Sequence, residues 1–205
     1  MNHLFNTPEA FIERLYNQLK TLQKGSHIAL SGGSSASVIS PLTAAGFDWS
    51  QYRLSLVDER CVGSDHEHSN YTYVASRLPE KAFLEPFYTG DSTVDIDRHA
   101  HFLEKYPIDV ALLGIGPDGH TASLFPDSNT SKEAAVAHTT TDTFAVHDRL
   151  TLTYSALEKI PQKYFLLFGD TKKQIMQQMK SNETLPASRV YSTGADVFYA
   201  PKRPT

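Results

Sequence analysis

Apolar side chains recur every three or four positions from Phe11 to Leu22, which predicts an amphipathic helix near the start of the chain. Thr7 suits the N-cap of this helix. Pro8 suits its first position, because the first N–H groups of a helix have no helical partner to lose. Gly25 is expected to end the helix.

Short apolar runs then alternate with helical spacings along the rest of the chain. Strands are predicted at 27–30, 53–57, 109–115, 149–153, 163–168 and 196–200. Helices are predicted at 35–45, 70–77, 93–105 and 171–180. Pro41 is expected to kink or divide the helix at 35–45, because proline lacks a backbone donor and clashes with the preceding turn. Residues 58–69 are predicted to form an irregular polar loop.

This alternation favours an α/β fold with a Rossmann-like, mostly parallel sheet flanked by helices. The chain has 205 residues, 40% of them hydrophobic, which is enough for one substantial core. Residues 1–205 are therefore expected to form a single domain. The irregular stretch 78–92 is a candidate for a small extra lobe.

Composition and charge narrow the range of partners. The formal net charge is -4 and the 19 lysines and arginines form no basic block, so no nucleic acid partner is expected. No apolar run approaches the ~20 residues of a membrane-spanning helix, so no membrane association is expected. Cys61 is the single cysteine, and the N-terminus lacks the pattern of a secretory signal. These features predict a cytoplasmic location.

A glycine turn follows the strand at 27–30. Ser31, Gly32, Gly33 and Ser34 lie between this strand and the next helix, where backbone N–H groups and the helix dipole favour a bound phosphate. A tight turn without a ligand explains the glycines equally well. The turn also approaches the Gly-x-Ser-x-Gly pattern of a serine nucleophile. Ala36 replaces the last glycine of that pattern, so a serine nucleophile is not favoured.

Charged side chains follow the strand at 53–57. Asp58 and Arg60 are expected at the same sheet edge as the glycine turn, and a guanidinium can hold a phosphate through two parallel hydrogen bonds. A surface ion-pair cluster is the alternative. Cys61 is interpreted as a packing residue rather than a reactive thiol. Residues 65–68 (DHEH) lack a third ligand at a known spacing, so a solvated loop is favoured and no metal site is predicted.

The segment from Gly114 to Gly119 matches Gly-x-Gly-x-x-Gly after a strand. A dinucleotide site would need a long helix after the last glycine, whereas a proline follows at position 126. We interpret the segment as a rigid loop that presents Asp118 and His120 at a strand end. Histidine titrates near neutrality, so His120 is a candidate general base that activates water. A loop-capping role is the alternative for an isolated histidine.

Two further cations are candidates for the same pocket. Arg149 begins the strand at 149–153, and Lys172 lies at the start of the helix at 171–180. The remaining histidines are interpreted as surface or packing residues, including His99, His101, His138 and His147.

These motifs resemble those of the 6-phosphogluconolactonases, the second enzymes of the oxidative pentose phosphate pathway. The matching segments follow the family order along nearly the whole chain: 30–34 (LSGGS), 58–62 (DERCV) with His66, Ser69 and Asn70, 113–126 (LGIGPDGHTASLFP), 149–153 (RLTLT) and 185–188 (LPAS). Three positions depart from the family pattern. Ser35 and Ala36 stand where Thr-Pro is usual, and Gly63 stands where proline is common. None of these changes removes a proposed catalytic group.

The resemblance implies the fold of the sugar-phosphate isomerases and deaminases, a Rossmann-like sheet with a small extra lobe. It also implies hydrolysis of a small sugar-phosphate lactone, 6-phosphoglucono-δ-lactone, with no metal or other cofactor. His120 would be the general base, and Asp58 would lie near the sugar or orient the catalytic groups. The implied substrate- and phosphate-binding residues are Ser31, Gly32, Gly33, Ser34, Arg60, Asp118, Arg149 and Lys172.

Two other functions are weighed against this one. Aminosugar-phosphate deaminases have a similar Asp-Gly-His loop, but they typically continue with Ile-Ala-Phe-Asn-Glu-Pro and carry tyrosine at the position of Arg60; this chain has TASLFP at 121–126. Sugar-phosphate sensors of this fold usually carry a DNA-binding segment, and none is evident before the first predicted strand. A monomer or a weak homodimer is expected.

Overall fold

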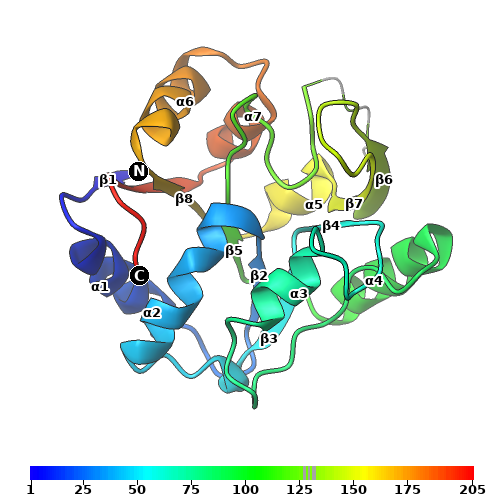
Figure 1. The fold of residues 1–205 in the computed structure, drawn as a ribbon, viewed down its shortest axis with the longest axis horizontal. Helices are drawn as coiled ribbons and strands as arrows, with labels where there is room; N and C mark the ends of the chain where they lie inside the picture. Colours follow the sequence, from blue (N-terminus) through cyan, green and yellow to red (C-terminus); the bar gives the residue numbers. More distant parts are fainter. Residues whose placement is uncertain (127, 129, 131–132) are drawn as a thin grey trace.

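The computed structural model describes residues 1–126, 128, 130 and 133–205 (Figure 1). Within these residues, six strands form one parallel sheet in the order β1-β9-β8-β5-β2-β3. Their bounds are β1 (Asn2–Leu4), β2 (His27–Leu30), β3 (Arg53–Leu56), β5 (Val110–Leu113), β8 (Gln162–Phe168) and β9 (Asp196–Ala200). The predicted α/β fold is confirmed. The sequence pattern did not indicate β1, which is three residues long and pairs with β9.

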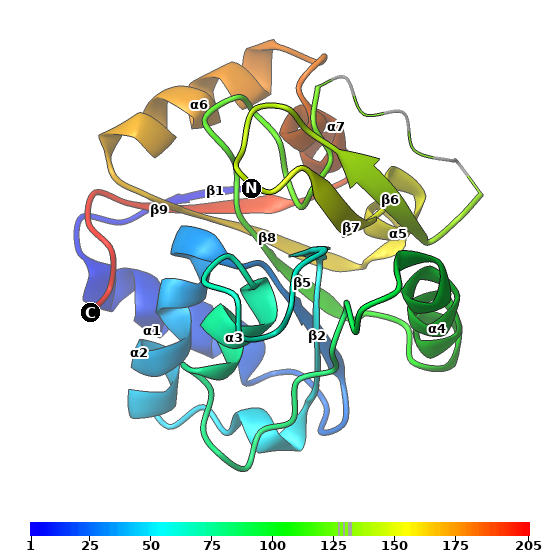
Figure 2. The same cartoon turned by 45° about the vertical axis from the view of Figure 1, so that its right-hand side comes forward.

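Helices cover both faces of this sheet. Figure 2 shows α1 (Pro8–Leu19) and α2 (Ile39–Ala44) on one side, and α6 (Asp170–Ser181) and α7 (Pro186–Ser192) on the other. The remaining helices are α3 (Asn70–Ala75), α4 (Ser92–Lys105) and α5 (Tyr154–Lys159), with short 3-10 turns at η1 (Gly33–Val38) and η2 (Trp49–Gln51). Among the described residues, no helix combines the length and the hydropathy that a membrane span requires.

The first helix begins as predicted. The Thr7 hydroxyl accepts a hydrogen bond from the backbone N–H of Ala10, and Pro8 occupies the first helical turn. The helix ends at Leu19, earlier than Gly25. The predicted helix at 35–45 is divided after Val38 into the 3-10 turn η1 and helix α2. Pro41 therefore lies in the first turn of α2, where its missing N–H breaks no helical hydrogen bond.

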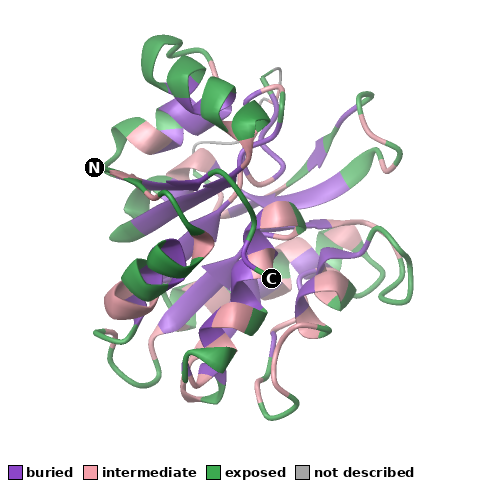
Figure 3. Ribbon diagram, turned by 60° about the vertical axis from the view of Figure 1, so that its left-hand side comes forward, coloured by how far each residue is buried: buried purple, intermediate pink, exposed green. Residues whose placement is uncertain are grey.

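The core lies between the sheet and its helices. Every residue of the central strands β2 and β5 is buried, and α1 packs Phe11, Leu15 and Leu19 against the sheet. Figure 3 shows buried residues along the strands and exposed residues on the outer faces of the helices. Full burial of each such leucine or phenylalanine contributes roughly 1.5–3 kcal/mol. The sheet is thus a rigid platform for the loops at its edge.

A second, smaller sheet is antiparallel and contains β4 (Asp58–Arg60), β7 (Asp148–Leu152) and β6 (Val136–Thr140) in the order β4-β7-β6. The prediction of an irregular loop from position 58 was wrong for these first three residues. Pairing with β7 makes them a strand, and nothing in their own polar sequence signals it. Only Val57 separates β3 from β4, so the small sheet begins at the carboxyl edge of the main sheet.

The stretch 78–92 is not an extra lobe, contrary to the sequence-based expectation. Leu84 pairs with Leu54 of β3, and Phe87 is completely buried. The carboxylate of Asp95 on α4 accepts hydrogen bonds from the backbone and side chain of Thr89, at 2.6 and 2.8 Å. These contacts bind the stretch to the main domain along β3 and α4.

Polar segments follow four strands at the carboxyl edge of the main sheet. Ser31 follows β2, Asp58 lies just beyond β3, Gly114 follows β5, and Gly169 follows β8. The chain leaves β2 toward β3 and leaves β5 toward β8, in opposite directions along the sheet. The switch point between β2 and β5 is where ligands bind in open α/β sheets.

Candidate active site

A cavity of about 220 Å³ opens at this switch point. All the predicted site residues except Asp118 line it: Ser31, Gly32, Gly33, Ser34, Asp58, Arg60, His120, Arg149 and Lys172. A larger hollow of about 520 Å³ lies between α4 and α5, but these cations and the histidine converge on the smaller cavity. The tertiary structure therefore brings together segments that are up to 141 positions apart, from Ser31 to Lys172.

Asp118 does not line the cavity but contacts His120, which does. Its Oδ1 is 2.5 Å from Nδ1 of the imidazole and also accepts the backbone N–H of His120 at 3.2 Å. Burial opposes ionisation of Asp118, but the hydrogen bond and charge of His120 outweigh it and hold the pKa of Asp118 below its usual value. A carboxylate that accepts a hydrogen bond from Nδ1–H keeps the proton on Nδ1 and leaves Nε2 as the basic nitrogen. Asp118 is thus an orienting residue for His120.

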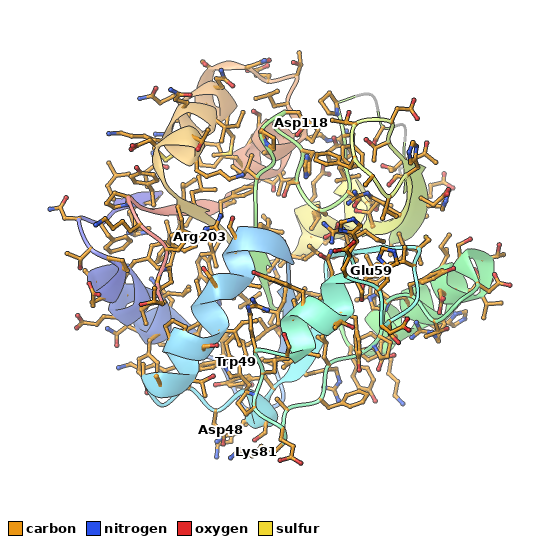
Figure 4. All side chains as sticks on the ribbon, viewed as in Figure 1. Asp48, Trp49, Glu59, Lys81, Asp118 and Arg203 are labelled. Carbon is orange, nitrogen blue, oxygen red and sulfur yellow. The ribbon has the colours of Figure 1, made fainter. Side chains whose placement is uncertain are left out.

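The loop that carries His120 is tied to the sheet at several points. The Thr121 hydroxyl donates to the carbonyl of Gly114 at 2.9 Å, and the backbone N–H of Gly116 donates to the carbonyl of His120 at 2.8 Å. From α7, the N–H of Ala187 donates to the carbonyl of Gly119 at 3.0 Å. Figure 4 shows Asp118 on this loop beyond β5. The loop lies at the end of β5, as predicted, and none of the described residues between it and β6 is helical.

Two arginines lie opposite each other on neighbouring strands of the small sheet. Arg60 of β4 is paired in register with Arg149 of β7. Arg60 donates from Nη1 to the carbonyl of His68 at 2.6 Å, and its buried Nε has no hydrogen-bond partner within the described residues. Burial lowers the pKa of Arg149, and the charge of Arg60 lowers it further, against the attraction of Asp58. Like charges opposite each other destabilise a sheet, so this pair favours an anion between them.

Lys172 adds a third cation from the first turn of α6. Its Nζ donates a hydrogen bond to the carbonyl of Ile115, which holds the amine next to the His120 loop. Burial and the positive charge of Arg203 lower the pKa of Lys172, while Asp118 opposes this shift. The amine therefore contributes positive charge on the β5 side of the cavity.

Asp58 links the small sheet to the His120 loop. Its Oδ2 accepts a hydrogen bond from the Ser123 hydroxyl at 2.6 Å, and both side chains are buried. Ser123 is itself held by Thr151 and Thr139 of the small sheet. Of the two roles that the resemblance implies for Asp58, this geometry favours the orienting role, because Asp58 holds the loop that carries His120.

Sequence reasoning assigned no role to Glu59, yet this residue ties β4, which carries Arg60, to the start of α3. The buried carboxylate accepts backbone N–H groups from Arg60, Asn70 and Tyr71 at 2.6–2.7 Å. Burial raises the pKa of Glu59, and these hydrogen bonds only partly counter it. Figure 4 shows Glu59 beside α3, whose first residue is Asn70. The sequence pattern alone does not distinguish a buried glutamate that binds backbone N–H groups from an exposed glutamate.

Asn70 belongs to one of the segments that match the family pattern, but only the structure shows its contacts. Its Nδ2 donates to the carbonyl of Asp58 at 3.0 Å, and its side chain lines the cavity. The amide also lies against Gly32, where an added Cβ would fall 2.0 Å from Oδ1. Gly32 is therefore required for this close approach as well as for the turn.

The other candidates behave as packing or surface residues. Burial raises the pKa of Cys61 to about 11, as expected for a packing thiol rather than a reactive one. His99 is buried, whereas His101, His138 and His147 are exposed. In the part of the chain that the structure describes, no three His, Cys, Asp or Glu side chains, including those at 65–68, are grouped to hold a metal ion.

Comparison with known proteins identifies the family. Residues 4–199 match the family of glucosamine-6-phosphate isomerases/6-phosphogluconolactonase. A 6-phosphogluconolactonase of Helicobacter pylori is 32% identical, over 94% of this chain and 92% of that protein. A probable 6-phosphogluconolactonase of Dictyostelium discoideum is 30% identical, over 84% of this chain and 83% of its own. The crystal structure of a 6-phosphogluconolactonase from Shewanella baltica OS155 matches with a TM-score of 0.85 and 27% identity, covering 98% of this chain and 97% of that one.

The chain belongs to the glucosamine-6-phosphate isomerase/6-phosphogluconolactonase family. The resemblance inferred from the motifs is confirmed.

Proposed function

We propose that this chain hydrolyses 6-phosphoglucono-δ-lactone to 6-phosphogluconate, the second step of the oxidative pentose phosphate pathway. One observation carries the proposal: a single cavity joins the Arg60–Arg149 pair and Lys172 to the His120–Asp118 pair. The three cations suit binding of a phosphate, and the histidine–aspartate pair suits hydrolysis of an ester. The relatives named above, which align over most of this chain, support the same reaction.

The phosphate would bind first and fix the position of the lactone. Its dianion would neutralise the facing charges of Arg60 and Arg149, and the buried Nε of Arg60 supplies a donor that has no partner within the described residues. The turn at Ser31–Ser34 adds backbone N–H groups at the same edge. Binding of this remote group holds the reacting carbonyl beside the base, which supplies much of the rate gain in such reactions.

The chemical step would then use the free nitrogen of His120. Nε2 accepts a proton from water as the water oxygen bonds to C1 of the lactone. Backbone N–H groups of a glycine loop stabilise the oxygen anion that forms. The bond between C1 and the ring oxygen breaks, and the imidazolium returns its proton to that oxygen, which becomes the C5 hydroxyl. Asp118 stabilises the imidazolium between these two transfers.

The test is turnover of freshly generated lactone by wild type and His120→Gln. The variant is expected to lower kcat by about 100-fold or more while affinity for 6-phosphogluconate stays nearly unchanged. His101→Gln is the matched control, because His101 is exposed on α4 and its Nδ1 pairs with the carbonyl of Asp97 on the same helix. Equal turnover by His120→Gln, after subtraction of spontaneous hydrolysis, would refute the proposed role. Ammonia release from glucosamine 6-phosphate would instead support the deaminase alternative. The cytoplasmic location and the monomer or weak homodimer stay predictions from the sequence.

A further inference from the structure

Phe144 is an aromatic residue on the hairpin loop of the small sheet. It lies at the centre of residues 141–147, which connect β6 to β7. Its neighbours Thr143 and Ala145 are exposed, whereas Phe144 is partly buried. The loop is held at both ends, since Thr141 donates to the carbonyl of His147 and Arg149 donates from Nε to the carbonyl of Val146, each at 3.2 Å. The ring therefore turns inward from a tethered loop.

This ring contacts His120. The ring centroids of Phe144 and His120 are 5.3 Å apart with an interplanar angle of 80°, an edge-to-face contact. Phe125 approaches the same imidazole with centroids 5.0 Å apart and an angle of 50°, and the two phenylalanines also touch each other at 5.9 Å. Such geometry is favourable for aromatic pairs. The imidazole thus has Asp118 at one nitrogen and aromatic rings around it.

The same rings also flank Arg149. Its guanidinium carbon is 5.3 Å from the centroid of Phe144 and 5.6 Å from that of Phe125, within the range of a cation–π contact. Phe144 itself does not line the cavity. Any effect of Phe144 on the reaction must therefore pass through His120 and Arg149 rather than through contact with the lactone.

We propose that Phe144 is a positioning residue for the reaction, and that its ring holds the His120 imidazole at the angle that directs Nε2 into the cavity. The hydrogen bond to Asp118 fixes one nitrogen but leaves the ring free to tilt about that bond. The contacts with Phe144 and Phe125 would limit this tilting of the imidazole. The inference rests on the proposed function, because it gives Phe144 a role only through His120.

Kinetics of three variants on freshly generated lactone test this inference. Phe144→Ala is expected to lower kcat roughly 10-fold, because small displacements of a reacting group cost large factors in rate. KM should change by less than about 3-fold, since Arg149 keeps its bond to Val146 and its contact with Phe125. Phe144→Tyr, which keeps the ring, should retain nearly the wild-type kcat. Val146→Ala removes a partly buried apolar side chain from the same loop and should leave kcat unchanged.

A spectroscopic measurement separates positioning from mere structural support. In protein labelled with ¹⁵N-histidine, the His120 signals should report one tautomer, with the proton on Nδ1, in wild type, Phe144→Tyr and Val146→Ala. Phe144→Ala should shift or broaden these signals while its thermal midpoint matches that of Val146→Ala. Wild-type kcat in Phe144→Ala would overturn the inference, as would unchanged His120 signals. A wild-type protein without lactone turnover would refute the proposed function instead, and the His120 signals would still decide whether Phe144 holds the ring.

Discussion

The imidazole of His120 lies directly against the backbone of Gly116. A methyl group at position 116 would stand 2.0 Å from Nδ1 and 2.1 Å from Cε1 of His120, and 2.7 Å from Oδ1 of Asp118. No side chain fits in that space while the hydrogen bond between Asp118 and His120 is intact. Position 116 is therefore suited to glycine because the His120 and Asp118 side chains occupy the place of its missing Cβ.

Gly116→Ala is accordingly expected to displace the imidazole and lower kcat by about 100-fold, since a shift of about 1 Å in a reacting group has effects of this size. Steady-state kinetics on the lactone, with circular dichroism to verify folding, provide the measurement. Gly46→Ala is the control. Gly46 has a φ of 93° and open space around it, so alanine there strains the backbone by roughly 1–2 kcal/mol without touching the cavity. A Gly116→Ala enzyme as active as wild type would contradict the expectation.

Arg60→Ala is expected to raise KM for the lactone by about 10-fold or more with a much smaller change in kcat, because the guanidinium would hold the phosphate equally in the ground state and the transition state. Calorimetry should show a matching loss of affinity for 6-phosphogluconate. Arg53→Ala is the matched control: it also removes one arginine, but Arg53 lies at the opposite end of β3 and stacks on Tyr106. An unchanged KM in Arg60→Ala would exclude Arg60 as a phosphate anchor.

His99 is expected to make the protein less stable in acid. Its ring is fully buried, with its centroid 4.0 Å from that of Phe87, and neither ring nitrogen has a hydrogen-bond partner within the described residues. Burial, reinforced by the charges of Arg98 and His27, lowers the pKa of His99 to about 3. An unfolded histidine titrates near 6.5, so the unfolded chain binds a proton that the folded chain excludes. The share of the unfolding free energy that depends on neutral His99 is therefore fully present above pH ~6.5 and is lost as the pH falls toward ~3.

The size of this effect is measurable by urea unfolding. From about pH 7.5 to about pH 5, His99 should account for about 2 kcal/mol of lost unfolding free energy. His99→Phe should remove that share. Burial also lowers the pKa of His27, to about 4, so His27 retains its own share in the variant. His101→Phe, at an exposed position on the same helix, should leave the pH dependence as in wild type. An identical pH dependence in His99→Phe and wild type would refute this account.

The sequence by itself determined most of the elements and the chemistry of the site. The apolar runs of β2, β5, β8 and β9 predict buried strands because the side chains of a doubly covered sheet are apolar on both faces. The glycine turn after β2 and the loop of His120 are local signals, and both lie where strand ends meet. The candidate chemistry could be predicted because the residues of each motif are consecutive in the sequence.

Only the tertiary structure decided which distant groups meet. Strands β1 and β4 are three residues each and exist through pairing with β9 and β7, so their own sequences contain no strand signal. Phe87 lies in the irregular stretch 78–92, and only the tertiary structure stacks its ring on His99. Phe144 likewise reaches His120 from 24 positions away. These contacts depend on long-range packing, which local propensity and periodicity do not encode.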